Sequence, residues 1–572
     1  MKNRRLARFL AIALCAAMSV PAFGGCSSGG EESSSAGSTG QSSAVSSGSG
    51  SGEKGDLYIE GSEGVTLTYW IPMDSVQTQN FSTLAEHPYF QWLQEQTGVT
   101  IEFIHPSYEQ MDQQLNLMIA SGEYYDMLHL PNYPGGPQAA IDENCFIDLN
   151  DYLDEYMPDY KEALYCSDGS FSAWEWGAEK ELYNPQPQPS FLDTCTTFDG
   201  SLWCVTQIWT DAYLPESGPV IRKDWLDEAG LDVPQTLDEL EVVLEAFKAR
   251  GEDVVPMNLG TYGTNGGDGS IISAFGLYAD YFTMDKEGTT VYPHAYTEDA
   301  FLDYLTLMND WYAKGYIDPD FMNRDDASLE AMFLDDRLGI YFNQWTTPDT
   351  WESRYTGDQD FEVVAMPLPR MDTDQQLTWV NGYNSEPTNY TVITSSCEHP
   401  EIAAAWLNVG FIKEAILRHT YGIEGEHYEL IDGVPYYTDV VFNGDQDYIF
   451  SCELFPNSAA YNSYRSGLLR SSADSAEVLS PRAEALTTWA QNASRDTVWK
   501  YVVFADDGWG EFDSALNDAL TYAQPMVLRF IIGEESLDNF DTFRETAKSM
   551  GLDKAQQAAQ AALDVMNQSA GE

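Results

Sequence analysis

The sequence predicts an α/β protein in which strands and helices alternate along the chain. Short runs of β-branched and aromatic residues, typical of buried strands, alternate with longer segments whose apolar residues recur at helical spacing. The chain has 572 residues, of which 43% are hydrophobic. A chain of this length is too long for a single core, so we expect two or more lobes.

The first alternation predicts a parallel sheet. VTLTYWI (Val65–Ile71), VTIEFI (Val99–Ile104) and YDMLHL (Tyr125–Leu130) have the composition of strands. A helix is expected at Leu84–Gln96, and a second helix is expected to end at Gly122. Because strands joined through helices run parallel within one sheet, this order predicts β-α-β units.

A second α/β region begins near Pro219. A short helix is expected to end at Gly230, since glycine suits the left-handed position after a helix. Thr236 and Glu239 have the spacing of a capping box and predict the start of a longer helix. The later elements are expected in this order: a helix with an aromatic face from Phe301 to a stop at Gly315, strands at Leu338–Trp345, Phe361–Pro369 and Thr391–Ser396, a helix opened by Pro400, and two Ala-rich helices between Asp538 and Asn567.

The first residues have the layout of an export signal. Four basic residues precede the apolar run FLAIALCAAMSV, and small residues follow it up to Cys26. The run is shorter than the roughly 20 apolar residues that span a bilayer. The ending FGGC resembles a bacterial lipobox, although Phe23 stands where leucine is usual. We therefore expect residues 1–25 to be a lipoprotein signal peptide and Cys26 to be lipidated; the alternative is an ordinary cleaved signal with an incidental cysteine.

Residues 26–56 are expected to form a tether. Between Ser27 and Glu53 there are 12 Ser and 7 Gly, a composition that cannot bury a core. A flexible chain of about 30 residues has an r.m.s. reach of about 30 Å. The body of the protein is then held beside the membrane but clear of the lipid headgroups.

Charge and cysteine usage narrow the function further. The formal net charge is −63, and so acidic a chain repels the phosphates of nucleic acids, so no nucleic-acid partner is expected. Of the eight cysteines, those that remain after Cys15 and Cys26 are scattered without metal-ligand spacing. An exported chain can oxidise them, and Cys195 with Cys204 can close a local loop; buried free thiols are the alternative.

The search for catalytic motifs is negative. The sequence contains no G-x-S-x-G elbow, no Walker loop and no H-E-x-x-H helix. The acidic loops at 263–270 and 372–376 do not complete an EF-hand pattern. We therefore expect no catalytic residue, no metal and no cofactor, and predict that the chain is not an enzyme.

One segment carries a family resemblance. IRKDWLDEAGLDVPQTLDEL (Ile221–Leu240) resembles the hallmark segment of extracellular solute-binding proteins, family 1, of carbohydrate ABC importers, and most closely the large lipoprotein branch of Gram-positive bacteria. Further segments resemble the same branch in the same order: SGEYYDMLHL (Ser121–Leu130), WYAKGYIDPDF (Trp311–Phe321), SSCEHPEIAAAWLN (Ser395–Asn408), YGIEGEHYELIDG (Tyr421–Gly433) and GLDKAQQAAQAALD (Gly551–Asp564).

The resemblance implies a two-lobe, periplasmic-binding-protein-like clamshell of type II-like α/β topology, with crossover strands at a hinge. Residues 57–205 with 385–430 are expected to form the N-terminal lobe, and residues 206–384 with 431–572 the C-terminal lobe. The implied function is capture of an oligosaccharide between the lobes and its delivery to an ABC permease. The chain is expected to be a monomer, held only by its lipid anchor at the outer face of the cytoplasmic membrane on a Gram-positive-type cell surface.

Candidate ligand contacts follow from the chemistry of sugars. Aromatic rings cover the apolar faces of a sugar, and polar side chains hold its hydroxyls. We therefore favour aromatic and polar residues near strand ends and crossovers: Trp70, Asp126, Trp209, Asn343, Gln344, Trp345, Trp379, Asn381 and Tyr383. The alternatives are a binding protein for another solute, such as a peptide, and a surface glycoside hydrolase or lyase. The charge favours a neutral ligand, and the sequence does not name the sugar.

Overall fold

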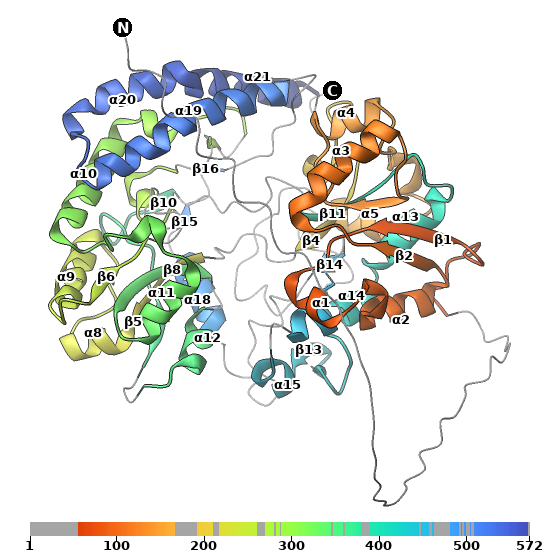
Figure 1. Cartoon of the computed structure of the whole chain (residues 1–572), viewed down its shortest axis with the longest axis horizontal. Coiled ribbons are helices and arrows are strands. Elements are labelled where there is room, and N and C mark those ends of the chain that lie inside the picture. The colour runs from red at the N-terminus through yellow and green to blue at the C-terminus, as the bar shows by residue number, and fades with distance from the viewer. Residues whose placement is uncertain are drawn as a thin grey trace, which may run out of the picture. The chain divides into compact units, whose positions relative to one another are not determined.

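The computed structural model contains two separate β-sheets with helices packed around them (Figure 1). The structure describes residues 55–165, 191–209, 217–259, 269–278, 282–285, 288–344, 347–357, 361–378, 388–445, 448–456, 460–462, 481–490, 493–494, 497–498, 504 and 508–569. The signal peptide, Cys26 and almost all of the tether lie outside these residues.

The first sheet has six strands in the order β14-β4-β11-β3-β1-β2. All are parallel except β11, which runs antiparallel to both of its neighbours. The strands are β1 (Thr66–Trp70), β2 (Thr100–Ile104), β3 (Met127–His129), β4 (Val205–Trp209), β11 (Thr388–Ile393) and β14 (Tyr461–Asn462).

The predicted first alternation is confirmed. Helix α2 (Pro88–Thr97) joins β1 to β2 and ends at a left-handed Gly98, and α3 (Met111–Ser121) joins β2 to β3 and ends at a left-handed Gly122. The helix expected from Leu84 is interrupted by a short 3₁₀ turn. It restarts at Pro88, because proline lacks an N–H group and suits only the first turn of a helix.

The second sheet has four strands in the order β6-β8-β5-β9. Strand β5 is antiparallel to β8 and β9, and β6 is parallel to β8. The strands are β5 (Ser217–Arg222), β6 (Val255–Met257), β8 (Leu338–Gln344) and β9 (Val363–Ala365). Strand β9 is shorter than expected, since Pro367 and Pro369 cannot donate backbone hydrogen bonds to a neighbouring strand.

The helices beside the second sheet follow the prediction closely. Helix α8 (Lys223–Ala229) ends at a left-handed Gly230, and α9 (Leu237–Lys248) begins with the predicted capping box. Helix α10 (Asp299–Lys314) buries its aromatic face, and the two expected terminal helices are α20 (Phe540–Ala547) and α21 (Asp553–Ser569). Figure 1 shows both beside α19 (Gly508–Ile531), which contacts α10.

The remaining elements are short. The helices are α1 (Ser75–Asn80), α4 (Gly136–Asp142), α5 (Pro158–Tyr165), α7 (Phe191–Cys195), α11 (Asp326–Leu334), α12 (Thr347–Arg354), α13 (Pro400–Val409), α14 (Lys413–Thr420), α15 (Asp439–Asn443) and α18 (Pro481–Ala490). Two-stranded pairs are formed by β7 (Met284–Asp285) with β16 (Thr497–Val498), β10 (Leu377–Thr378) with β15 (Ala493–Ser494), and β12 (Tyr428–Ile431) with β13 (Val434–Tyr437).

The structure corrects two predicted lobe boundaries. Residues 431–462 were expected in the second lobe, but β14 pairs with β4, and the turn Ile449–Leu454 packs on α1 and α2 of the first. The expected boundary between residues 205 and 206 falls inside β4. A two-residue strand such as β14 has no periodicity to read, so the sequence carried no signal for this pairing.

The chain passes between the two sheets three times, and each time from the same part of the first sheet. It leaves from β4 to β5, returns to β11 after β9 and the short β10, and leaves again from β14 to α18, which packs on β5 and β9 of the second sheet. The first-sheet strands of these connections, β14, β4 and β11, are neighbours. The connecting residues 210–216, 379–387 and 463–480 lie outside the described residues.

The elements that follow the first and third connections, β5 and α18, are in contact. The Trp489 indole of α18 donates from Nε1 to the carbonyl of Pro219 at 3.1 Å. Its ring lies so close to Gly218 that a Cβ atom there would be 2.5 Å from it. Glycine at position 218 therefore allows α18 to pack directly on the start of β5.

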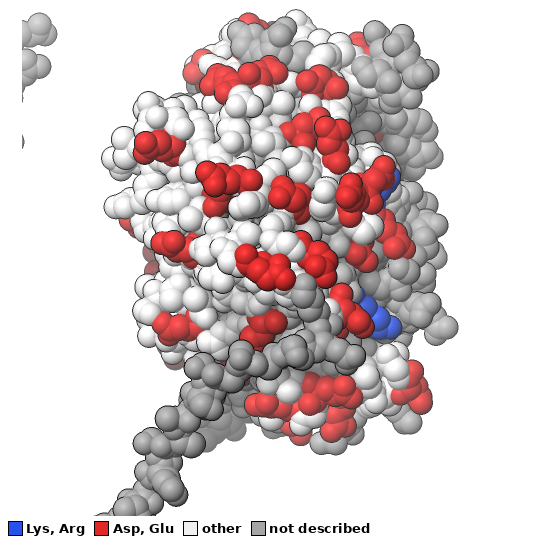
Figure 2. Space-filling model, turned by 90° about the vertical axis from the view of Figure 1, so that its right-hand side faces the viewer, with Lys and Arg blue, Asp and Glu red and all other residues white. Residues whose placement is uncertain are grey.

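The described residues are strongly acidic on the side of the first sheet. Figure 2 shows Asp and Glu spread over that face, with few Lys or Arg among them. Residues 55–165 contain 19 Asp and Glu but only one basic residue, Lys161. Among the residues that the structure describes, no helix is both long and apolar enough to cross a bilayer.

Four of the buried histidines, His87, His129, His294 and His419, have a shifted pKa. Burial lowers the pKa of His294 to about 4 and those of the other three to about 3, because desolvation disfavours the charged ring. Unfolding restores a pKa near 6.5, so the unfolded chain gains protons as the pH falls below about 6.5. The free energy of unfolding therefore falls from about pH 6.5 towards pH 3.

Replacing His294 by Asn tests this pH dependence. The His294 Nδ1 atom accepts from the Tyr296 N–H at 3.3 Å, and an Asn side chain can supply an acceptor in its place. We expect the free energy of unfolding of this variant, measured with urea, to depend less steeply on pH between about pH 6 and pH 5. The slope should be smaller than that of the wild type by about 1.4 kcal/mol per pH unit. His399, which is partly exposed, is replaced by Asn as the matched control. An unchanged slope in H294N would contradict the assignment.

Candidate functional site

The edge of the first sheet at which the crossovers begin is the candidate site. The carboxyl ends of β1, β2, β3 and β4 lie at this edge, together with the amino end of the antiparallel β11. In open α/β sheets, ligands bind outside the carboxyl ends of the strands. The corresponding edge of the second sheet holds the carboxyl end of β8 and the amino end of β5.

Trp70 does not fit this site. It ends β1 as expected, but its side chain is 1% exposed and its Nε1 atom donates to Gln114 Oε1 at 3.4 Å. Neighbouring Tyr69 and Ile71 are buried as well. Because a parallel strand covered on both faces buries consecutive side chains, Trp70 is part of the core. The expectation that its ring faces a ligand is corrected.

Asp126 lies at the opposite edge of the first sheet. It precedes β3, and its Oδ2 atom accepts from the backbone N–H and the hydroxyl of Thr68, both at 2.7 Å. Thr68 Oγ1 in turn accepts from the Asp126 N–H at 2.9 Å. These three bonds connect β1 to β3 at the amino end of β3, so Asp126 has a structural role here.

Asn343 and Gln344 do lie at the predicted edge of the second sheet. They end β8 and pair with Gly218 and Ser217, the first residues of β5 after the first crossover. Gln344 is exposed, and Asn343 is half-buried, with its Oδ1 atom accepting from the Gln344 N–H at 2.7 Å. Two amide side chains therefore stand where the chain enters this sheet.

Trp209 is the last residue of β4, at the other end of the same crossover. Ser217 follows it by eight positions, so the two Cα atoms are at most about 29 Å apart even if the connection is fully extended. The remaining predicted contacts, Trp345, Trp379, Asn381 and Tyr383, lie outside the described residues.

Sequence reasoning missed Tyr108 and Asp74. Asp74 follows β1 by four residues and caps α1, and Tyr108 follows β2 by four residues. Tyr108 is 52% exposed. Burial and the charge of Asp74 raise the pKa of the Tyr108 hydroxyl, so the carboxylate is within electrostatic range of this hydroxyl. An exposed ring beside a carboxylate suits one face and one hydroxyl of a sugar. Extending the strand-end rule into the following loops would have found both.

A pair of amides was also missed. Asn389, at the amino end of β11, donates from Nδ2 to Gln207 Oε1 in β4 at 2.9 Å. Asn389 has a positive φ of 44°, and the register between the two strands shifts beside it. Irregular pairing of this kind re-aims side chains and is over-represented near binding sites. No pattern in the sequence marks this irregularity.

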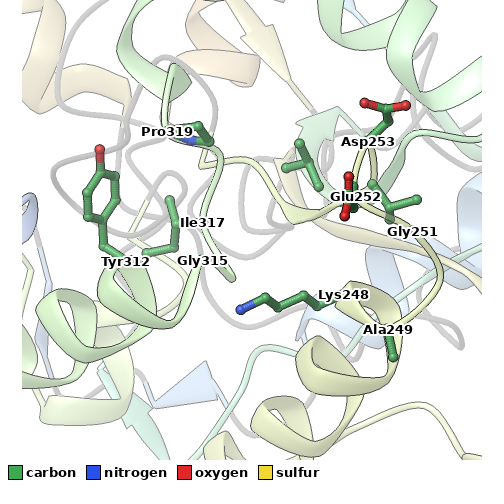
Figure 3. Close-up of a pocket in the computed structure, with 11 residues that line it drawn as sticks. Lys248, Ala249, Gly251, Glu252, Asp253, Tyr312, Gly315, Ile317 and Pro319 are labelled. Atoms are coloured by element: carbon green, nitrogen blue, oxygen red, sulfur yellow. The ribbon is translucent and has the colours of Figure 1, made fainter.

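The structure has a pocket that is not part of this site. It has a volume of about 590 Å³ and lies between the ends of α9 and α10 (Figure 3). Val255 at the amino end of β6 lines it, so it is at the opposite edge of the second sheet from Asn343 and Gln344. Lys248 crosses it and donates to the carbonyl of Lys314. Within the part of the chain that the structure describes, no group of three His, Cys, Asp or Glu can hold a metal ion.

Replacing Trp70 by Ala tests its assignment to the core. Loss of a fully buried indole is expected to lower the free energy of unfolding by about 3–5 kcal/mol. The exposed Gln344, replaced by Ala, should change it by no more than about 0.5 kcal/mol. Urea denaturation of both variants measures the difference. A W70A variant of wild-type stability would show that the ring is not packed in the core.

Comparison with known proteins agrees with this fold. The family model for bacterial extracellular solute-binding proteins matches residues 89–416, more than half of the chain. The fructooligosaccharide ABC transporter substrate-binding protein FusA of Streptococcus pneumoniae is 24% identical over 64% of this chain and 66% of its own length. The polygalacturonan/rhamnogalacturonan-binding protein YtcQ of Bacillus subtilis is 24% identical over 45% of this chain and 51% of its own. Lipoprotein LipO of Bacillus subtilis is 25% identical over 61% of this chain and 65% of its own.

The chain thus spans between half and two thirds of the length of these relatives. Solved structures match over more of the chain. FusA in complex with fructo-nystose is 19% identical, covers 89% of this chain and 100% of its own, and has a TM-score of 0.65. A solute-binding protein from Bifidobacterium longum infantis, described as HMO binding and ABC-transporter associated, is 17% identical over 88% of this chain and 99% of its own, with a TM-score of 0.66. The chain has the two-lobe α/β fold of these proteins and belongs to the bacterial extracellular solute-binding proteins.

Proposed function

We propose that the protein captures an oligosaccharide outside the cell and delivers it to the permease of an ABC importer. The observation that carries the proposal is the family match over residues 89–416, since the named ligands of FusA and YtcQ are carbohydrates. The fold alone does not select a ligand, because specificity resides in the site. The residues at the two sheet edges supply the remaining support.

These residues have the chemistry that a sugar requires. Tyr108 offers an exposed ring, Asp74 a carboxylate, and Asn389 with Gln207 an amide pair on the first sheet. Asn343 and Gln344 supply amides on the second sheet. Of the other predicted contacts, Trp209, Trp379, Asn381 and Tyr383 precede or fall within crossovers in the sequence, and Trp345 follows β8. Rings of this kind cover the C–H faces of a sugar, and amides and carboxylates pair with its hydroxyls.

Binding is proposed to act by hinge closure. A ligand that contacts both lobes only when they are shut shifts the population towards the closed form. The strands that these connections leave or enter, β4, β11 and β14, are neighbours in the first sheet, which suits a hinge. The closed form then docks on the permease, and ATP is hydrolysed elsewhere, so the sugar leaves this protein chemically unchanged.

We also propose that Cys26 carries a lipid anchor and that the Ser/Gly tether holds the protein at the outer face of the cytoplasmic membrane. The export signal, the FGGC ending and the relation to Lipoprotein LipO support this location. A single acyl chain binds a bilayer only marginally, so the diacyl modification typical of such lipoproteins is required. The acidic face of the first lobe repels anionic lipids, so membrane contact is left to the anchor.

Thermal denaturation with a panel of oligosaccharides tests the proposed function. A ligand that binds only the folded state raises Tm, because it increases the free energy of unfolding. The increase is about 2.7 kcal/mol when the ligand concentration is a hundred times Kd. We expect a neutral oligosaccharide to raise Tm and charged uronic-acid oligomers to raise it less, because the chain carries a net charge of −63. Chromatography of the bound sugar should recover it intact.

Two outcomes would contradict this proposal. Release of cleaved sugar, abolished by replacing one carboxylate, would make the protein an enzyme. A rise in Tm with peptides and with no sugar would assign it to another class of solute.

Replacing Tyr108 by Ala tests the proposed contact on the first lobe. Loss of the ring should weaken binding of the sugar found in the panel about three- to tenfold, with little change in Tm because the side chain is exposed. Tyr108→Phe keeps the ring and should retain most of the affinity. Phe198, an exposed ring in the turn before β4, at the opposite edge of the first sheet, is the control when replaced by Ala. Equal affinities for Y108A and F198A, measured by calorimetry, would remove Tyr108 from the site.

A further inference from the structure

Cys195 and Cys204 lie together at the start of the strand that leads into the first crossover. Cys195 ends α7, and Cys204 immediately precedes β4. Both side chains are fully buried, and neither is in a disulfide in this structure. The proposed function does not use either of them.

The backbone around the two cysteines forms a tight hairpin. Thr196 pairs with Leu202 in an antiparallel bridge, and the Trp203 N–H donates to the carbonyl of Cys195 at 3.0 Å. The turn between them is closed by a bond from the Gly200 N–H to the carbonyl of Thr197 at 3.0 Å. The two cysteines therefore leave the same end of one hairpin.

The thiols also share their surroundings. The hydroxyl of Tyr160 in α5 lies 3.9 Å from Cys195 Sγ and donates to the carbonyl of Cys204 at 3.1 Å. Burial raises the pKa of the Cys204 thiol well above its ordinary value, and the neighbouring Cys195 thiol adds to this effect. The other described cysteines have different neighbours: Cys145 lies beside Tyr124, Cys397 beside Asp126, and Cys452 beside the first turn of α1.

We propose that Cys195 and Cys204 form a disulfide in the exported protein. The family is extracellular, and disulfides persist in oxidising compartments outside the cell. Six cysteines allow many disulfide pairings, but the hairpin brings Cys195 and Cys204 together. Few of the other pairings therefore need be considered. The proposal does not depend on the identity of the ligand.

The oxidant is a disulfide, either of a thiol oxidoreductase or of a small molecule. One cysteine thiolate attacks the oxidant, forms a mixed disulfide with it and releases the first thiol of the oxidant. The thiolate of the other cysteine then attacks the mixed disulfide, forms the Cys195–Cys204 bond and releases the second. The two cysteines together lose two electrons and two protons, and the oxidant gains them as two thiols. The step takes place during folding, since the native fold buries both sulfur atoms and hides their thiolates from solvent.

The disulfide would hold the amino end of β4, the strand that leads into the first crossover. It closes a loop from α7 to β4 and adds a covalent constraint where Tyr160 already connects α5 to the start of β4. A cross-link of this kind stabilises chiefly by restricting the unfolded chain. Its loss is expected to lower Tm by a few degrees and to leave sugar affinity nearly unchanged.

Peptide mapping gives a direct test. The chain has no Lys or Arg between Lys180 and Arg222, so trypsin releases both cysteines in the single peptide 181–222. The full chain is folded in a mixture of reduced and oxidised glutathione, unfolded in acid, alkylated and digested. The expected peptide is two hydrogen atoms lighter than its reduced form, carries no alkyl group, and gains two alkyl groups only after reduction. Two alkyl groups without reduction, or a link from Cys195 or Cys204 to another cysteine, would overturn the proposal.

A variant separates this disulfide from any other effect of reductant. The Tm of the wild-type protein should fall when a reductant is added. The Tm of a variant that carries both C195S and C204S should not change. Cys145→Ser is the matched control and should keep the wild-type response. If the double variant folds poorly, the peptide map of the wild-type chain still decides the question. An equal reductant response in C195S/C204S and wild type would place the responsive bond elsewhere.

Discussion

The antiparallel insertion of β11 between β3 and β4 is the constraint on which the candidate site depends. It requires the chain to return from the second sheet and to enter the first sheet from the edge where β3 and β4 end. The bond between Tyr69 Oη and Thr391 Oγ1, at 2.7 Å, connects β1 to β11 inside the sheet. The carboxyl end of β4 and the amino end of β11 are therefore neighbours, and amides from the two strands meet there.

Sequence patterns predicted elements that have several turns or several alternating residues. Helices α9 and α10 and strands β1, β2 and β8 appeared where apolar periodicity and capping residues placed them. The pairing of β14 with β4 was missed, because two residues carry no period and their partner lies more than 250 positions away in the chain. Which sheet a segment joins is decided by long-range packing, and local propensity contains no information about it.

The site was predicted only in part, for a related reason. The strand-end rule placed Asn343 and Gln344 correctly at their edge, since β8 was easy to recognise. It misplaced Trp70, because a parallel strand buried on both faces offers no side chain to solvent until the chain has left the sheet. Asp74 and Tyr108 lie four residues further on, in loops whose shapes come from capping and turn geometry. Asp126 was chosen for its type, and its bonds to Thr68 show that a carboxylate beside a strand can be structural.

The contact of Trp489 with Gly218 makes two of the three connections mechanically dependent. The first connection ends at β5, and the third ends at α18, which is fastened to the same two residues of β5 by the indole ring and its bond to Pro219. A displacement of α18 is therefore transmitted to the start of β5 through this contact. At the second sheet, the elements after the first and third connections thus share one attachment, whereas the second connection returns to β11 of the first sheet.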